Sequence, residues 1–184
     1  LKDIKAGIKP PLEPDEEKLL KNKIDNYFTS LNPVLKSRAL RIAGLAKYCG
    51  IFPLAIKCAS SREEKPFVRR DAFEAMWSLI VCDESYRDEV LETIVKGLSD
   101  PYYETRFYAA RLISIFGEHY ELSGIERKEL LYLLYLNLKD RCFEVRLESI
   151  LAIANIAKDG EKVLEKYEGC YYDKVWKVRK ALFK

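Results

Sequence analysis

The sequence is poor in the residues from which enzyme and metal sites are usually built. Its 184 residues include one His, one Met and no Gln. It contains no H-E-x-x-H motif, no G-x-S-x-G motif and no Gly-rich phosphate loop. A single histidine, His119, cannot by itself supply a His-based metal site or a catalytic triad. We therefore expect no catalytic residue, no cofactor and no metal site, and predict that the protein is not an enzyme.

Long apolar segments are also missing. The chain has no run of 18 uncharged apolar residues, so we expect no membrane span. The opening segment, LKDIKAGIKPPLEP, lacks the apolar stretch of a secretory signal, and we expect a cytoplasmic protein. There is no initiator Met, and the last residues, KVRKALFK, come abruptly; we expect a processed chain or a fragment of a longer protein.

The cysteines are odd in number and form no C-x-x-C pair. They are Cys49, Cys58, Cys82, Cys142 and Cys170. Most of them fall within apolar helical patterns, where a cysteine behaves as a small hydrophobic residue. We expect free thiols rather than a disulfide or metal framework. Free thiols favour a reducing, intracellular compartment.

The overall composition is that of a folded chain, with 48% apolar and 33% charged residues. Lys, Glu, Ile and Tyr are abundant, which resembles the composition of thermophile proteins. The net charge of +3 is too small to indicate nucleic-acid binding by itself.

Helical periodicity dominates the chain after its first segment. Residues 1–14, with three prolines and no periodicity, predict a lead-in or linker. From residue 15 to residue 184 apolar residues recur at helical spacing, and no segment alternates as a half-buried strand does. The predicted fold class is all-α. The expected helix pairs are 15–31 with 33–48, 50–60 with 65–80, 85–98 with 100–116, 126–139 with 141–157, and 160–170 with 174–184.

A common pattern recurs in the second segment of each pair. Each contains an arginine: Arg38, Arg69, Arg106, Arg146 and Arg179, at intervals of 31, 37, 40 and 33 residues. Six positions before each arginine stands an acidic residue or an amide: Asn32, Glu63, Asp100, Asp140 and Asp173. Apolar residues follow four and seven positions after it, where the chain reaches. The pattern indicates an internal repeat.

The recurring acid and arginine could be a catalytic pair or part of the architecture. Six residues on a helix turn through about 240° net, so the two side chains do not share a face. A catalytic pair is needed once, whereas this one recurs. We predict that Asp100, Asp140 and Asp173 cap the helices that follow them, with Pro101 as the first helical residue.

The D-x-x-x-x-V-R-x-x-A pattern on the second helix of a helix-turn-helix pair resembles HEAT repeats, an armadillo-like family, and especially the type seen in phycobilisome lyase-like proteins. The resemblance covers residues 15–184 and implies a right-handed α-solenoid of about five repeats. It is weakest in the first repeat, which has Asn32, Ser37 and Arg41. It also implies a ladder of hydrogen bonds between successive repeats, with Asp100, Arg106, Asp140, Arg146, Asp173, Arg179, Arg69 and Arg38 as its members. Deoxyhypusine hydroxylase, an iron enzyme built on HEAT repeats, binds its metal through His-Glu pairs, which this chain lacks.

The second helices carry most of the positive charge. They sum to +10, while the whole chain has +3. The resemblance places second helices on the concave face of the solenoid, so we expect that face to be basic. The candidate partner-binding residues there are Arg70, Glu74, Trp77, Tyr108, Arg111 and Glu148. Trp77 replaces the small residues of the other repeats, and either fills the core or serves with Tyr108 as an anchor.

Three functions remain open from the sequence. The first is a protein-interaction scaffold whose partner has an acidic surface. The second is nucleic-acid binding through the same basic face, and the third, from the resemblance alone, is a tetrapyrrole lyase-like subunit. The apolar C-terminal residues, among them Trp176 and Phe183, have no polar cap. We expect more repeats after them, a partner, or self-association through this edge.

Overall fold

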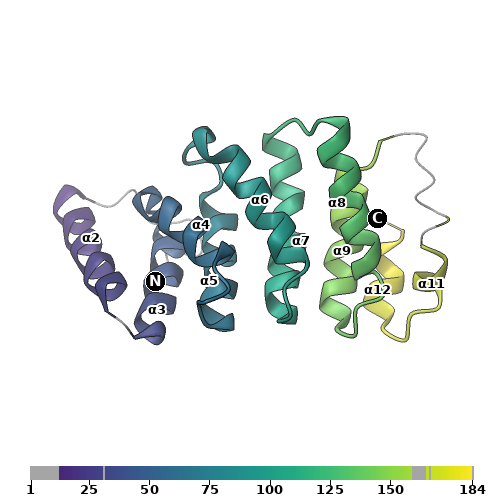
Figure 1. Ribbon diagram of the computed structural model, residues 1–184, viewed down its shortest axis with the longest axis horizontal. Helices are drawn as coiled ribbons and strands as arrows, with labels where there is room; N and C mark the ends of the chain where they lie inside the picture. Colours follow the sequence, from purple (N-terminus) through teal and green to yellow (C-terminus); the bar gives the residue numbers. More distant parts are fainter. Residues whose placement is uncertain (1–12, 31, 159–164, 166, 184) are drawn as a thin grey trace. The chain divides into compact units, whose positions relative to one another are not determined.

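The structure is a computed structural model that describes residues 13–30, 32–158, 165 and 167–183 (Figure 1). The expected lead-in, residues 1–14, lies outside the described residues except for its last two positions. All regular secondary structure in the described ranges is helical, which confirms the all-α prediction. The chain divides into two compact units, residues 1–90 and 91–184, and each is described by itself.

Unit 1 contains two pairs of helices. They are α2 (Pro14–Thr29), α3 (Pro33–Ala46), α4 (Phe52–Ser60) and α5 (Pro66–Leu79), with 3₁₀ turns η1 (Cys49–Ile51) and η2 (Glu84–Tyr86). Helix α3 packs against both α2 and α5, and α4 packs against α5. Three of these helices begin with a proline, whose fixed φ suits the first turn and whose missing N–H is not needed there.

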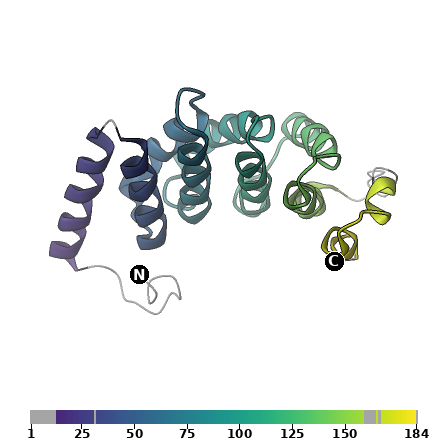
Figure 2. The same cartoon turned by 90° about the horizontal axis from the view of Figure 1, so that it is seen from below.

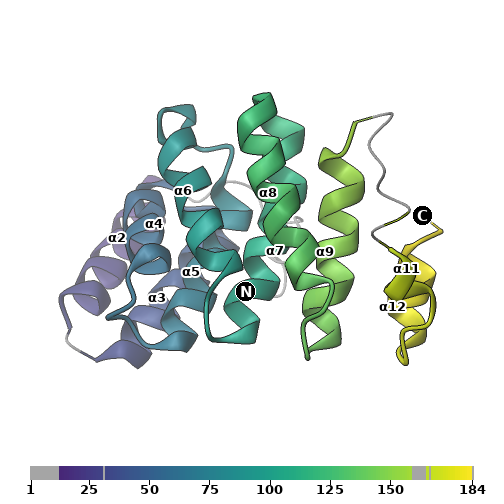
Figure 3. The same ribbon diagram turned by 45° about the vertical axis from the view of Figure 1, so that its right-hand side comes forward.

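Unit 2 also pairs its helices (Figure 2). Its elements are α6 (Arg87–Leu98), in which the boundary between the units falls, α7 (Tyr103–His119), α8 (Gly124–Asn137), α9 (Phe143–Ile156), α11 (Glu168–Tyr171) and α12 (Trp176–Ala181). Helix α9 packs between α7 and α12, and α8 and α11 pack against α9 and α12 respectively (Figure 3). Helix α8 begins with a capping box in which Ser123 and Glu126 satisfy each other's backbone N–H groups.

The same positions are buried in α5, α7 and α9 when residues are counted from the first residue of each helix. The third, seventh, eighth and eleventh residues are buried in α5 (Val68, Ala72, Phe73, Met76), α7 (Thr105, Ala109, Ala110, Ile113) and α9 (Val145, Ser149, Ile150, Ile153). This spacing defines one helix face. The sequence repeat therefore reflects a repeated packing surface.

Asp100, Asp140 and Asp173, which each stand six residues before an arginine, do not cap the helices that follow them. The prediction that they do was wrong. The Oδ1 atoms of Asp100, Asp140 and Asp173 accept from the backbone N–H two residues later, at 2.8, 2.9 and 2.8 Å. Each following helix begins three residues after the aspartate, so Pro101 is not a helical residue. Each aspartate thus closes an Asx turn before the helix, because its short side chain reaches the backbone locally.

The first repeat has a different register from the one predicted. Asn32 is itself the N-cap, accepting from the Val34 N–H at 2.9 Å, and α3 begins at Pro33. Helix α3 therefore begins one residue after Asn32, whereas α7 and α9 begin three residues after their aspartates. As a result the fourth helical residue, equivalent to Arg106, is Lys36, and Arg38 is exposed. The alignment of this repeat on Arg38 was wrong.

Thr105 offers a stability test of the repeated packing. It is fully buried, and its Oγ1 has no hydrogen-bond partner within the described residues. Val68 and Val145 occupy the same position in α5 and α9. Because Thr105→Val removes an unsatisfied buried hydroxyl, we expect the free energy of unfolding to rise by about 1 kcal/mol. Urea denaturation measures the change; Thr105→Ser, which loses the methyl group and keeps the hydroxyl, should lower stability, and equal stability of both variants would contradict the expectation.

Candidate functional site

Arg106 links its own turn to the next repeat. Its Nε donates to Asp140 Oδ2 at 2.7 Å, and its Nη1 donates to the Asp100 carbonyl at 2.6 Å. The Asp140 side chain is 6% exposed and that of Arg106 18%, so the pair is largely shielded from solvent. The contact holds α9 in position beside α7.

Arg146 repeats this arrangement one step further along. Its Nε and Nη2 donate to Asp173 Oδ2 and Oδ1 at 2.6 and 2.9 Å, and its Nη1 donates to the Asp140 carbonyl at 2.8 Å. The hydrogen bond from Arg146 lowers the pKa of Asp173 below its usual value. The bidentate geometry fixes orientation as well as distance.

Unit 1 has a related contact with different residues. Lys36 Nζ lies 2.6 Å from Glu64 Oε1, and Arg69 Nη1 donates to the Glu64 carbonyl at 2.6 Å. The ladder position expected for Arg38 is filled by Lys36, and Glu64 rather than Glu63 is its partner. Within each unit these charged residues pair with one another and so connect neighbouring repeats. Their role is therefore structural.

The predicted binding residues of α5 form the α5 patch: Arg70, Glu74 and Trp77. All three are half-buried. Arg70 Nε donates to Asp71 Oδ1 at 2.7 Å, and Asp71, 1% exposed, also accepts from Ser37 Oγ of α3. Asp71 was not among the predicted binding residues, although it stands two residues after Arg69, the position that Tyr108 occupies after Arg106. Its burial fixes the Arg70 side chain on the patch.

The predicted residues of unit 2 form the α7–α9 patch: Tyr108, Arg111 and Glu148. Each is half-buried. Burial raises the pKa of Glu148, and the positive charge of Arg111 partly offsets that rise, so the carboxylate of α9 lies within electrostatic reach of α7. The Tyr108 ring packs edge-on against Phe107, with centroids 4.8 Å apart. Near the start of α7, Tyr103 is exposed and Tyr108 is half-buried.

A pocket of about 670 Å³ lies in unit 1 among α2, α3, α4 and the turn before α5. The pocket is lined by Asp25, Phe28, Thr29, Lys36, Leu54, Lys57, Cys58, Ser61, Glu63 and Glu64. Burial raises the pKa of the Cys58 thiol to about 11, so this cysteine is protonated and unreactive at neutral pH. The lining mixes both charge signs, and its cysteine is not a reactive thiolate. It could not be predicted from the sequence, because its residues come from four separate segments.

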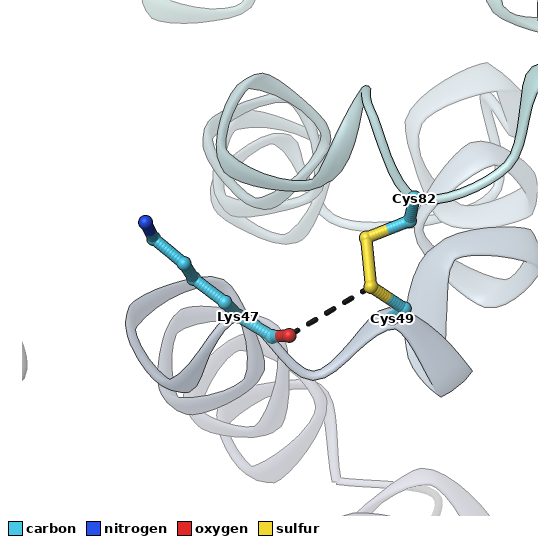
Figure 4. The surroundings of a disulfide bond; sticks show 3 residues. All are labelled: Lys47, Cys49 and Cys82. Atoms are coloured by element: carbon cyan, nitrogen blue, oxygen red, sulfur yellow. Dashed lines mark hydrogen bonds between the residues drawn. A yellow bond between two sulfur atoms is a disulfide. The ribbon is translucent and has the colours of Figure 1, made fainter. Parts of the chain in front are cut away.

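Two cysteines are joined in a disulfide, which corrects the prediction of free thiols (Figure 4). Cys49 in η1 is bonded to Cys82 in the loop after α5, and the Cys49 sulfur lies 3.8 Å from the Lys47 carbonyl oxygen. Cys58, Cys142 and Cys170 are free. The expectation of a reducing compartment therefore loses the observation on which it was based.

Two kinds of site are absent from the described part of the chain. No three His, Cys, Asp or Glu side chains there are grouped so that they could hold a metal ion. None of the helices in those ranges combines the length and the apolar character that crossing a membrane requires.

The comparisons with known proteins assign no family to this geometry. No protein-family model matches the chain, and no curated protein matches it significantly.

Proposed function

We propose that the protein is a right-handed α-solenoid of about five HEAT-like repeats that acts as a non-catalytic protein-interaction scaffold. The observation that carries the proposal is the repeated contact of unit 2, in which Arg106 binds Asp140 and Arg146 binds Asp173. Each aspartate closes an Asx turn, and each arginine anchors on its own turn. Repeats that contact their neighbours in one recurrent way build stiff binding surfaces rather than enclosed active sites.

Each unit has its own proposed recognition surface, the α5 patch in unit 1 and the α7–α9 patch in unit 2. Both combine charged side chains with a half-buried aromatic ring, the type of residue that dominates protein interfaces. Arg70 is held by the buried Asp71, so part of the surface is already ordered before binding. The second helices sum to +10, and the partner in this proposal is a protein with an acidic surface, whose carboxylates would meet Arg70 and Arg111 in the two patches.

Tyr108→Ala is expected to reduce partner binding at least tenfold, because aromatic anchors in interfaces contribute about 2–4 kcal/mol. The tagged chain and the variant are used to capture proteins from cells of the source, and recovery of each captured protein is quantified by mass spectrometry. Tyr132→Ala, which removes a 63% exposed tyrosine from α8, is the matched control. A partner recovered equally with both variants does not bind through the α7–α9 patch.

Charge reversal tests the same surface without removing an aromatic ring. Arg111→Glu should release an acidic partner, whereas Lys128→Glu, the same change at an exposed position of α8, should not. Far-ultraviolet circular dichroism of both variants shows whether the fold is retained. Equal effects of the two substitutions would indicate a general charge effect and contradict the proposed site.

Nucleic acid is the second candidate partner, favoured by the excess positive charge of the second helices. Its test is fluorescence anisotropy with labelled DNA and RNA at about 50 and 200 mM salt, since phosphate binding weakens steeply over that range. Salt-sensitive binding that Arg111→Glu abolishes would favour nucleic acid over a protein. A tetrapyrrole lyase-like role depends on the resemblance alone, and the absence of any absorbance change with a bilin would exclude it.

A further inference from the structure

The corrected register of α3 changes the position of two arginines. Counted from the first residue of its helix, Arg38 is the sixth residue of α3, as Tyr108 is of α7. Arg41 is the ninth residue of α3, as Arg111 is of α7. Neither Arg38 nor Arg41 was predicted to bind a partner, yet both stand at positions where α7 carries its candidate binding residues.

Two contacts fix how α3 lies against α5 (Figure 1). Near the start of both helices, Ser37 Oγ donates to Asp71 Oδ2. About two turns later, Gly44 lies so close to α5 that a Cβ atom there would be 3.1 Å from Ala75 Cα. The contacts advance in the same direction along both helices, so α3 and α5 run parallel. Ser37 and Gly44 mark the line along which α3 contacts α5.

Arg38 and Arg41 lie to one side of this contact line. At about 100° per residue, they are rotated from it by about 100° and 40°. On α5, Arg70 and Glu74 are rotated from the contact line by about 100° and 60° in the opposite sense. Because the helices are parallel and their contact sides face each other, these opposite rotations place all four residues on one face of unit 1.

The guanidinium groups of Arg38 and Arg41 are available on this face. Both residues are exposed, and neither side chain has an ion-pair or hydrogen-bond partner among the described residues. A third arginine is held beside them, because Arg70 Nε donates to Asp71 Oδ1 at 2.7 Å. The other oxygen of Asp71 accepts from Ser37, the residue before Arg38. The buried Asp71 therefore brings Arg70 next to the part of α3 that carries Arg38.

The charge and spacing of this face define what it accepts. Arg38 and Arg41 are three residues apart, about 4.5 Å along the helix axis, which matches carboxylates one turn apart on a docked helix. Val34, four residues before Arg38, is 46% exposed on the same side of α3 and offers an apolar contact. Glu74 repels a uniformly charged phosphate backbone. An acidic polypeptide therefore fits this face better than a nucleic acid does.

We propose that the α3–α5 face, formed by Val34, Arg38, Arg41, Arg70 and Glu74, binds an acidic helical segment of the partner protein. Two carboxylates of that segment, one helical turn apart, accept from Arg38 and Arg41, and an apolar residue beside them covers Val34. The α3–α5 face extends the α5 patch onto α3. This inference rests on the proposed scaffold function and specifies the part of the partner that unit 1 binds.

The probe is a fluorescently labelled peptide of glutamate, alanine and leucine, with its glutamates three and four residues apart so that they share one helix face. Its binding to the intact chain is followed by anisotropy at low salt, about 50 mM. The double change Arg38→Gln and Arg41→Gln is expected to weaken binding about tenfold, because two charge-assisted hydrogen-bond donors are removed. Lys23→Gln with Lys57→Gln, which removes the same total charge from exposed positions of α2 and α4, should change binding less than about twofold.

The binding measurement can overturn the proposal in several ways. A chain that does not bind the peptide lacks the proposed face. Equal effects of the two double changes would show a general attraction to positive charge rather than a site. Tighter binding of a labelled DNA or RNA of the same length, lost with the same two arginines, would identify nucleic acid as the occupant.

A stability measurement separates binding from a structural role. The double change Arg38→Gln and Arg41→Gln should leave the midpoint of urea denaturation unchanged, because these side chains are exposed. Arg69→Gln, which removes a buried donor to the Glu64 carbonyl, should lower the midpoint. Equal losses of stability would assign Arg38 and Arg41 to the packing of unit 1 and overturn the proposal.

The capture experiment distinguishes failure of this inference from failure of the proposed function. A captured protein whose recovery falls with Tyr108→Ala, but not with the double change at Arg38 and Arg41, supports the scaffold function and overturns the role of the α3–α5 face. A captured protein that is lost with the double change alone binds through unit 1, and contradicts the role proposed for the α7–α9 patch.

Discussion

Breaking the Cys49–Cys82 disulfide is expected to lower the free energy of unfolding of unit 1 by up to about 4 kcal/mol. The two cysteines are 33 residues apart, and the loop that they close contains all of α4 and α5. The bond restricts the unfolded chain, so its loss raises the entropy of unfolding. Unit 1 contains Trp77 and unit 2 contains Trp176, the two tryptophans of the chain. Urea denaturation in a Trp176→Phe background, followed by tryptophan fluorescence, therefore reports on unit 1.

The disulfide prediction has an internal control. A thiol reductant should shift the denaturation midpoint of the Trp176→Phe protein and leave that of the same protein with Cys49→Ser and Cys82→Ser unchanged. Titration of thiols in denaturant without reductant should count three, for Cys58, Cys142 and Cys170. A count of five, or a midpoint that does not respond to reductant, would show that the bond is absent in solution.

The sequence predicted helices well because their signals are local. Apolar spacing located the helices, and Pro33 and Pro66 mark the first residues of α3 and α5. The recurring arginine pattern also located the buried faces of α5, α7 and α9. The first repeat was misaligned because an arginine was used as the reference point. Asn32 caps its helix directly, whereas Asp100 closes an Asx turn before α7 begins, and this difference of two residues is not evident from the sequence.

Contacts between segments could not be predicted in the same way. Cys49 and Cys82 show no motif, and their pairing depends on how the segments at either end of α4 and α5 meet in space. Asp71 looks like an ordinary surface acid of a charged stretch, but the close packing of α3 on α5 buries it against Ser37. Of the candidate site, the half-buried second-helix residues could be chosen from the repeat register, while their partners required the structure.

Asp173→Asn is expected to lower the free energy of unfolding by about 2–3 kcal/mol. Removing one charge of a shielded pair leaves the other without its partner, and such changes cost about 3–5 kcal/mol when the pair is fully buried. Here the Asp173 side chain is 7% exposed and that of Arg146 15%, so we expect a smaller loss. Asparagine retains an oxygen for the Val175 N–H, so the Asx turn is kept, while its NH2 group replaces the oxygen that accepts from Arg146 Nε. Glu92→Gln, which removes an exposed partner of Lys96, is the control and should cost less than about 0.5 kcal/mol.

The contribution of the Asp173–Arg146 pair to stability should decrease as the pH falls. Arg146 lowers the folded-state pKa of Asp173 below its unfolded value, so the stabilisation is complete above an unfolded pKa of about 3.9 and is lost as the pH falls through the folded pKa. The stability difference between the unmodified protein and Asp173→Asn should be constant from about pH 5 to pH 7 and shrink below about pH 4. Urea denaturation at these pH values, followed by circular dichroism, measures it. A difference that persists unchanged at pH 3 would mean that the variant acts through packing, because at that pH the unfolded chain binds a proton at Asp173 and the contribution of the charge must decrease.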